Sequence, residues 1–202
     1  IRNINLMRQE GLLADNRDMQ TWVSKRTSLR NLDIILKLEQ FLLRQFKEEA
    51  QRFNYKELNE DALKAGLSYS NIKRLKMLLH FLSLKGYIYK QEHGYSNSVS
   101  VRRQTSQKIT TARFERRMDI CRFIINELNV GRDLGKDLTL VNFSVVELLK
   151  QYNARQQDTM FAEHSKPDIA DMEEALLYLS KTELMKVEGG FITRYDPYSM
   201  EI

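Results

Sequence analysis

Residues 72–101 read IKRLKMLLHFLSLKGYIYKQEHGYSNSVSV, and this stretch decides the predicted fold. In its first half the apolar residues recur at steps of three and four, the spacing of one helical face, and Gly86 marks the end of that helix. Two β-prone runs, 87–90 and 98–101, then flank turn-forming residues at 93–97. The stretch therefore predicts an amphipathic helix followed by a β-hairpin.

Two further helices precede this pair. Apolar residues at helical spacing predict a long helix over 32–50, and a short helix over 58–65 meets Gly66, whose freedom at positive φ suits a helix C-terminus. Ser68 or Ser70 is expected to cap the helix that follows. Helix, short helix, helix and hairpin is the order of a winged helix-turn-helix, in which the hairpin is the wing.

The second half of the chain repeats this order. A helical apolar pattern covers 114–128, and a capping box at 144–147 opens a second helix. Residues 165–167, with a serine and a proline, are expected to start a third helix. Runs at 184–187 and 191–195, joined through a Glu-Gly-Gly turn, predict a second hairpin.

The predicted fold class is mainly α with small β-hairpins, an α+β chain of tandem winged helix-turn-helix domains. Residues 1–27 are expected to form an N-terminal helical lead-in of two short helices. A basic first winged helix is predicted over 28–103, and a second one with an acidic third helix over 104–202. A linker without an apolar face is expected near 102–110.

The composition of the 202 residues is that of a globular chain, with 42% hydrophobic and 29% charged residues, which argues against a disordered tail. No apolar run approaches the roughly 20 residues that a spanning helix needs. Cys121 is the single cysteine, so an intrachain disulfide is impossible, and a reducing, cytoplasmic setting is the expectation. The chain starts at Ile1 without a signal-peptide pattern, which we interpret as a piece of a longer protein.

The net charge of +5 is unevenly distributed. Residues 1–105 carry 19 Lys and Arg against 11 Asp and Glu, a net +8, whereas residues 106–202 carry 13 against 16, a net −3. Phosphate neutralisation supplies most of the affinity of proteins for nucleic acid, so the first unit is the expected DNA-binding part. A solvated helix face covered by Lys and Arg is the structural alternative.

The candidate DNA-binding residues lie on the third helix of the first unit and around its hairpin. They are Lys73, Arg74, Lys76, Lys90, His93, Tyr95, Arg102 and Arg103. The third helix of the second unit is acidic and would repel phosphate, which favours a packing or protein-contact role. The DNA candidates of that unit lie on its first helix, at Arg113, Arg116 and Arg117.

No catalytic or metal site is predicted. The loop 131–137 resembles a P-loop only superficially, because three residues instead of four separate its glycines and Asp follows the lysine. The three histidines are scattered without metal-ligand spacing. Cys121 lies on the apolar face of its helix, as a small core residue does.

Three stretches together resemble a known family. They are NLMRQEGLLAD at 5–15, KELNEDA at 56–62 and VEGGFI at 187–192, and they are similar to the region beyond the motor core of large bacterial RecQ-type DNA helicases. The resemblance implies a winged helix that grips duplex or fork DNA beside a motor that hydrolyses ATP and moves 3′ to 5′, in DNA repair and recombination. It also implies that the hairpin 87–101, with Tyr95 near its tip, is a wing that touches or parts the strands.

The chain lacks the P-loop, the Asp-Glu box and the four-cysteine zinc site of that family. The motor, its ATP and its Mg²⁺ would therefore belong outside this chain, and no cofactor is predicted within it. The expected partners are DNA, bound mainly through phosphates, and a motor domain in the same full-length protein. Two alternatives stay open: a sequence-specific tandem winged-helix replication initiator or transcription regulator, and a scaffold that binds proteins only.

Overall fold

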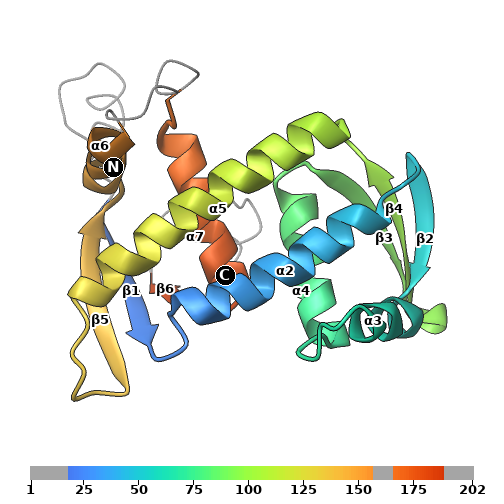
Figure 1. Cartoon of the computed structure of the whole chain (residues 1–202), viewed down its shortest axis with the longest axis horizontal. Helices are drawn as coiled ribbons and strands as arrows, with labels where there is room; N and C mark the ends of the chain where they lie inside the picture. The colour runs from blue at the N-terminus through green and yellow to red at the C-terminus, as the bar shows by residue number, and fades with distance from the viewer. Residues whose placement is uncertain (1–17, 157–165, 189–202) are drawn as a thin grey trace, which may run out of the picture.

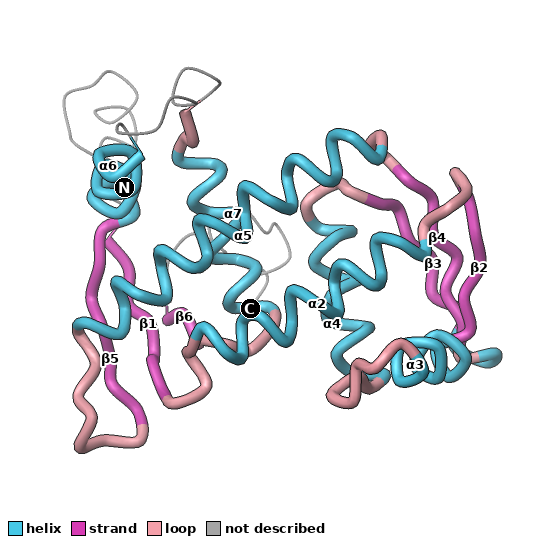
Figure 2. The backbone as a smooth tube through the Cα atoms, viewed as in Figure 1, coloured by secondary structure: helices cyan, strands magenta, loops and turns pink. Residues whose placement is uncertain are grey.

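The computed structural model describes residues 18–156 and 166–188. In these ranges the chain is α+β, with six α-helices and two three-stranded antiparallel sheets. The two sheets lie at opposite ends of the molecule, and helices fill the space between them (Figure 2). The expected α+β class with a helical majority and small strands is confirmed.

No helix in the described part of the chain has the length and apolar character needed to cross a membrane.

The first unit contains three helices and the first sheet. Its elements in chain order are α2 (Leu29–Gln45), β2 (Ala50–Asn54), α3 (Tyr55–Lys64), α4 (Ile72–Leu84), β3 (Ile88–His93) and β4 (Ser98–Arg103). The strands pair in the order β2-β4-β3, so the predicted hairpin is present and gains β2 as a third strand. The long helix predicted over 32–50 ends at Gln45 because the chain must turn to place β2 against β4.

Asparagine side chains cap two helices of this unit. Asn54 accepts a hydrogen bond from the Glu57 N–H at 3.1 Å at the start of α3. Asn71 accepts from the Arg74 N–H at 2.9 Å at the start of α4. The cap predicted at Ser68 or Ser70 is therefore wrong, since Ser70 is buried and its hydroxyl donates to Asn59 instead.

The second unit also combines three helices with one sheet. Its elements are β1 (Asp18–Ser24), α5 (Gln107–Val130), β5 (Leu138–Ser144), α6 (Val145–Gln156), α7 (Ile169–Lys181) and β6 (Lys186–Glu188). The strands pair in the order β5-β1-β6. The predicted helices of this unit are present, and α7 starts after a capping box between Asp168 and Asp171.

Residues 18–24 correct the helical lead-in predicted over 1–27. They form the central strand β1, in which buried Met19, Thr21 and Val23 alternate with more exposed residues, the period of two that a strand requires. Residues 1–17 lie outside the described residues. The second predicted hairpin is described only through β6, because its return run at 191–195 also lies outside them.

The connection predicted near 102–110 is shorter in the structure and covers residues 104–106. β4 extends to Arg103, and α5 begins at Gln107 after Ser106 accepts a hydrogen bond from the Ile109 N–H at 3.2 Å. Helix α5 then runs past α2 and α7 (Figure 1). The buried apolar residues of both units form one continuous core cluster.

Candidate nucleic-acid interface

The exposed face of α4 carries Lys73, Lys76 and His80, at steps of three and four residues. Lys73 Nζ lies 3.4 Å from the carboxylate of Glu183, and both side chains are more than half exposed. Lys76 Nζ lies 4.8 Å from the centroid of the Tyr55 ring. Two of the predicted helix residues are therefore placed on one solvent-facing surface.

His80 extends this positive surface toward the hairpin. Loss of solvation lowers the pKa of His80, and the charges of Lys181 and Lys90 lower it further. The imidazole therefore lies in the positive field of two lysines. Sequence spacing alone did not identify His80 as part of this surface, although it is seven residues after Lys73 on the same helix.

Arg74 is less exposed than Lys73 and Lys76. Its side chain is half-buried, and Nη1 donates to the carbonyl oxygen of Tyr69 at 2.5 Å. The guanidinium thus ties the start of α4 to the preceding loop. Position within a helix does not reveal such a backbone partner, and a DNA contact of Arg74 stays a prediction.

Lys90 and Glu92 lie on the side of β3 that faces α3 and α4. Lys90 Nζ is 3.0 Å from Glu92 Oε1, and the hydroxyl of Tyr55 donates to the same carboxylate at 2.5 Å. Burial raises the pKa of Glu92, but the hydrogen bonds from Tyr55 and Lys90 outweigh burial and the net pKa is lowered. Most of the Lys90 charge is therefore compensated locally.

The opposite side of the first sheet, which we call the outer sheet face, follows from the strand register and the alternation of side chains. It consists of Ala50, Arg52, Asn54, Tyr89, Gln91, His93, Ser98, Ser100 and Arg102. Arg102 and His93 of the predicted set lie on it. His93 Nε2 is 2.7 Å from Ser100 Oγ.

Arg52 was missed from the sequence. It lies on β2, a strand that the sequence analysis did not predict, and its guanidinium donates to Ser98 Oγ at 3.1 Å and to Ser96 Oγ at 2.9 Å. The alternation of apolar Phe53 and Tyr55 with polar neighbours was the available signal. That signal covers too few residues to separate a strand from a loop.

Tyr95 lies at the tip of the hairpin, in a single 3-10 turn over Gly94–Ser96, and its side chain is fully exposed. Arg103 belongs to the other side of the sheet from Arg102, because neighbouring strand residues point in opposite directions. The eight predicted residues are thus divided among α4, the two sides of the sheet and the hairpin tip.

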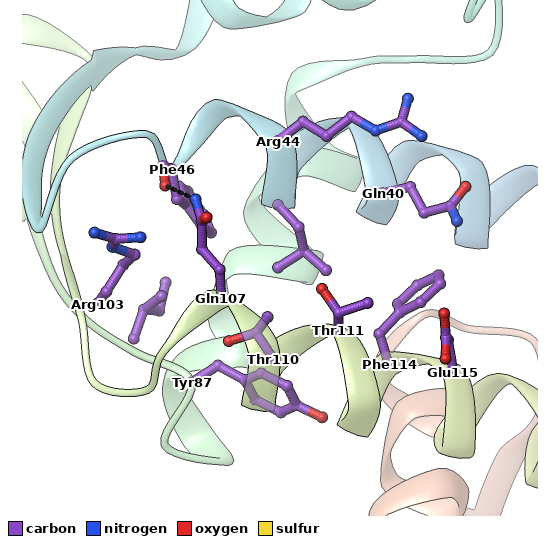
Figure 3. A pocket seen from close by; sticks show the side chains of 12 residues that line it. Gln40, Arg44, Phe46, Tyr87, Arg103, Gln107, Thr110, Thr111, Phe114 and Glu115 are labelled. Carbon is purple, nitrogen blue, oxygen red and sulfur yellow. Dashed lines mark hydrogen bonds between the residues drawn. The ribbon is translucent and has the colours of Figure 1, made fainter.

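Arg103 borders a cavity of about 400 Å³ between α2, α5 and the start of β3. The lining includes the apolar side chains of Phe46 and Phe114. Arg44 and Arg103 lie on opposite sides of it, with their guanidinium groups apart from one another (Figure 3). The cavity therefore lacks a converging pair of cations for an anionic ligand.

The three arginines proposed for DNA binding on the first helix of the second unit, Arg113, Arg116 and Arg117, pair with carboxylates instead. Arg117 is 2% exposed, and its two terminal guanidinium nitrogens, Nη1 and Nη2, donate to the two carboxylate oxygens of Glu39 at 2.7 and 2.5 Å. The α7 carboxylates pair with α5 in the same way, with Arg113 Nη2 at 2.6 Å from Glu174 and Arg116 Nε at 3.7 Å from Asp171. The acidic character of α7 is therefore largely a packing feature.

Cys121 is buried in the core as predicted, and burial raises the pKa of its thiol. The loop 131–137 connects α5 to β5, so it follows a helix where a P-loop would follow a strand. Across residues 18–156 and 166–188, no cluster of three or more His, Cys, Asp or Glu side chains is arranged to hold a metal ion.

No protein-family model, curated protein or solved structure matches this chain. The geometry of the described residues is therefore what supports a function.

Proposed function

We propose that the first unit is a winged helix that binds duplex DNA, with α4 as the recognition helix and the β3–β4 hairpin as the wing. The order of helix, strand, two helices and hairpin, closed by a three-stranded sheet, supports this assignment. In such domains the second helix of the helix-turn-helix enters the major groove. Helix α4 occupies that position and packs beside β3 (Figure 1).

The observation that carries the proposal is the exposed pair Lys73 and Lys76 on α4. An exposed ion pair such as Lys73–Glu183 contributes little free energy, so a phosphate can replace the carboxylate at small cost. Each lysine that neutralises a phosphate releases condensed counterions, which gives affinity without base preference. The expected binding is therefore strong at low salt and similar for unrelated duplexes.

The larger role that we propose is that of a DNA-binding accessory region in a RecQ-like ATP-dependent helicase. It rests on the family resemblance of the sequence, and ATP and Mg²⁺ would act in a motor domain outside this chain. DNA repair and recombination would be the corresponding processes. A sequence-specific initiator or regulator is the second candidate, because exposed lysines on a recognition helix suit it equally.

The test compares Lys73→Ala and Lys76→Ala in a duplex-binding titration between 50 and 200 mM salt. Each change should lower the slope of log affinity against log salt by about 0.9, the value for one phosphate contact on B-DNA. Lys150→Ala is the matched control, because this exposed lysine on α6 also forms an ion pair with a glutamate. Unchanged slopes for both α4 variants would exclude α4 as the DNA surface.

The same titration is also carried out with Arg74→Ala and with a set of duplexes of unrelated sequence. Arg74 binds a backbone carbonyl, so its removal should lower the unfolding midpoint and leave the salt slope unchanged. A preference of about 10³-fold or more for one duplex sequence would favour the regulator over the helicase accessory region.

A further inference from the structure

The side chains of the outer sheet face form regular rows, and this face is separate from the α4 surface. Antiparallel pairing places them in three rows across β2, β4 and β3: Ala50, Arg102 and Tyr89; Arg52, Ser100 and Gln91; Asn54, Ser98 and His93. The central strand β4 contributes the small side chains Ser98 and Ser100 and the long side chain of Arg102. Two serine hydroxyls therefore lie between the arginines of this face and His93.

The fixed charges of this face are both positive, on Arg52 and Arg102. None of its nine side chains is a carboxylate. Within the described ranges the Arg102 side chain, which is exposed, makes no ion pair or hydrogen bond, and Arg52 binds only serine hydroxyls, so neither guanidinium charge is neutralised. The nearest strand carboxylate, Glu92, pairs with Val99 in register and lies on the opposite side of the sheet, where Tyr55 and Lys90 bind it.

Tyr89 adds an exposed aromatic ring to this positive face. It is 62% exposed and lies directly opposite Arg102, a cross-strand neighbour at a Cβ separation of about 5 Å. An aromatic ring on a sheet, beside arginines, is a stacking platform for unpaired bases, which every base can use because every base has a π-face. A paired base inside a duplex cannot offer that face to Tyr89.

We propose that the outer sheet face binds a short segment of single-stranded DNA, with a base stacked on Tyr89 and phosphates held by Arg102 and Arg52. The choice of DNA rests on the proposed function, whereas the choice of a single strand rests on the exposed ring and the uncompensated arginines. The four-stranded sheets of RNA-recognition modules stack two or three bases on several aromatic residues, so the single exposed ring of this three-stranded sheet is expected to stack one. Successive residues of β3 alternate between this face and the side toward α4, so single-strand and duplex binding use different side chains.

The test measures binding of a fluorescent 12-nucleotide oligo-dT to the full 202-residue chain by anisotropy. Tyr89→Ala should weaken this binding by about 5- to 150-fold, the loss expected for one stacked base, and Tyr89→Phe should retain it. Arg52→Ala and Arg102→Ala should each reduce the salt slope by about 0.7, the value for one phosphate on a single strand. Gln91→Ala, a neutral change on the same face, should leave the salt slope unchanged.

A duplex titration of the same variants separates this proposal from the previous one. Tyr89→Ala should leave duplex affinity unchanged, and Lys76→Ala should weaken duplex binding while oligo-dT binding persists. Oligo-dT binding by a parent chain that does not bind duplex DNA would reject the α4 assignment and leave the outer sheet face as the single-strand site. The single-strand site would be overturned if oligo-dT did not bind, or if its binding were unaffected by Tyr89→Ala and Arg102→Ala. Tighter binding of oligo-rU than of oligo-dT would overturn the assignment to DNA.

Far-UV circular dichroism melts accompany each variant. Arg102→Ala removes an exposed side chain that has no hydrogen bond or ion pair to residues 18–156 or 166–188, so this variant should fold like the parent chain even if a change at Tyr89 disturbs the sheet.

Discussion

Arg117 and Glu39 form a bidentate ion pair in the core, where α5 crosses α2. The guanidinium carbon also lies 4.4 Å from the centroid of the Tyr178 ring and 4.8 Å from that of Phe81. The sequence analysis placed Arg117 at a DNA surface, and this was wrong. A usable signal existed, because each residue interrupts an apolar helical stripe, but the period of one helix does not tell which other helix supplies the partner.

Removing one member of this ion pair should strongly destabilise the fold. We expect Arg117→Met to lower the free energy of unfolding by about 3–5 kcal/mol, because the Glu39 carboxylate would stay buried without its partner. The double variant Glu39→Met with Arg117→Met should recover most of that loss, since apolar side chains of similar volume often replace buried ion pairs without net cost. Urea unfolding of both variants checks this, and equal losses in the two would refute it.

His80 makes the α4 surface sensitive to pH. Its pKa in the folded chain lies below the ordinary value, so the unfolded chain binds the proton more readily and the His80 contribution to stability is lost as pH falls below about 6.5. Duplex phosphates nearby would raise that pKa, so binding should take up a proton. We therefore expect duplex affinity to rise severalfold from pH 8 to pH 6.

His80→Gln isolates this effect from the other histidines. The variant should show a flatter dependence of duplex affinity on pH, while its affinity at pH 8 stays close to that of the parent chain. Identical pH profiles for the two proteins, measured at constant ionic strength, would show that no proton on His80 is linked to binding.

At the level of elements, the helices and the first hairpin were predictable from the sequence, whereas the strands β1, β2 and β5 were not. Helices and hairpins are encoded by neighbours in sequence, which is why α4, the β3–β4 hairpin and α7 follow from periodicity and turn residues. Strand β1 pairs with β5, which is more than a hundred residues away, and β2 pairs with β4 across two helices. Such pairing leaves only a short alternating pattern in the strand itself.

Paired substitutions in β1 distinguish a strand from the predicted helix. Val23 is buried and Gln20 is exposed, as expected for positions of opposite parity in a strand, whereas in a helix they would share a face at a spacing of three. Val23→Lys should lower the free energy of unfolding by several kcal/mol, because a buried ammonium would lack a partner, and Gln20→Lys should change it by less than about 0.5 kcal/mol. Similar losses in both would favour a helix.

At the scale of the whole molecule, the boundary predicted between residues 103 and 104 divides a shared core. The hydroxyl of Tyr87 in the first unit is 2.8 Å from Glu174 of α7, and the rings of Phe81 and Tyr178 meet edge to face at 5.0 Å between centroids. Repeated element order suggested two tandem winged-helix domains. Repetition reveals how many units a sequence contains but carries no information on how much apolar surface they bury against each other.

The two units should therefore unfold together. Trp22 is the single tryptophan and lies in β1, so its fluorescence reports the second unit, whereas far-UV circular dichroism reports the helices of both. We expect the two signals to give one coincident urea transition, as in a two-state protein. Tyr178→Ala should lower the free energy of unfolding by about 3–5 kcal/mol, equally in both signals, because the ring packs on side chains of both units.

The fragment 28–103 should not fold alone, since Phe81 and Tyr87 would lose their partners in the second unit. A cooperative melt of that fragment would instead establish two separable domains.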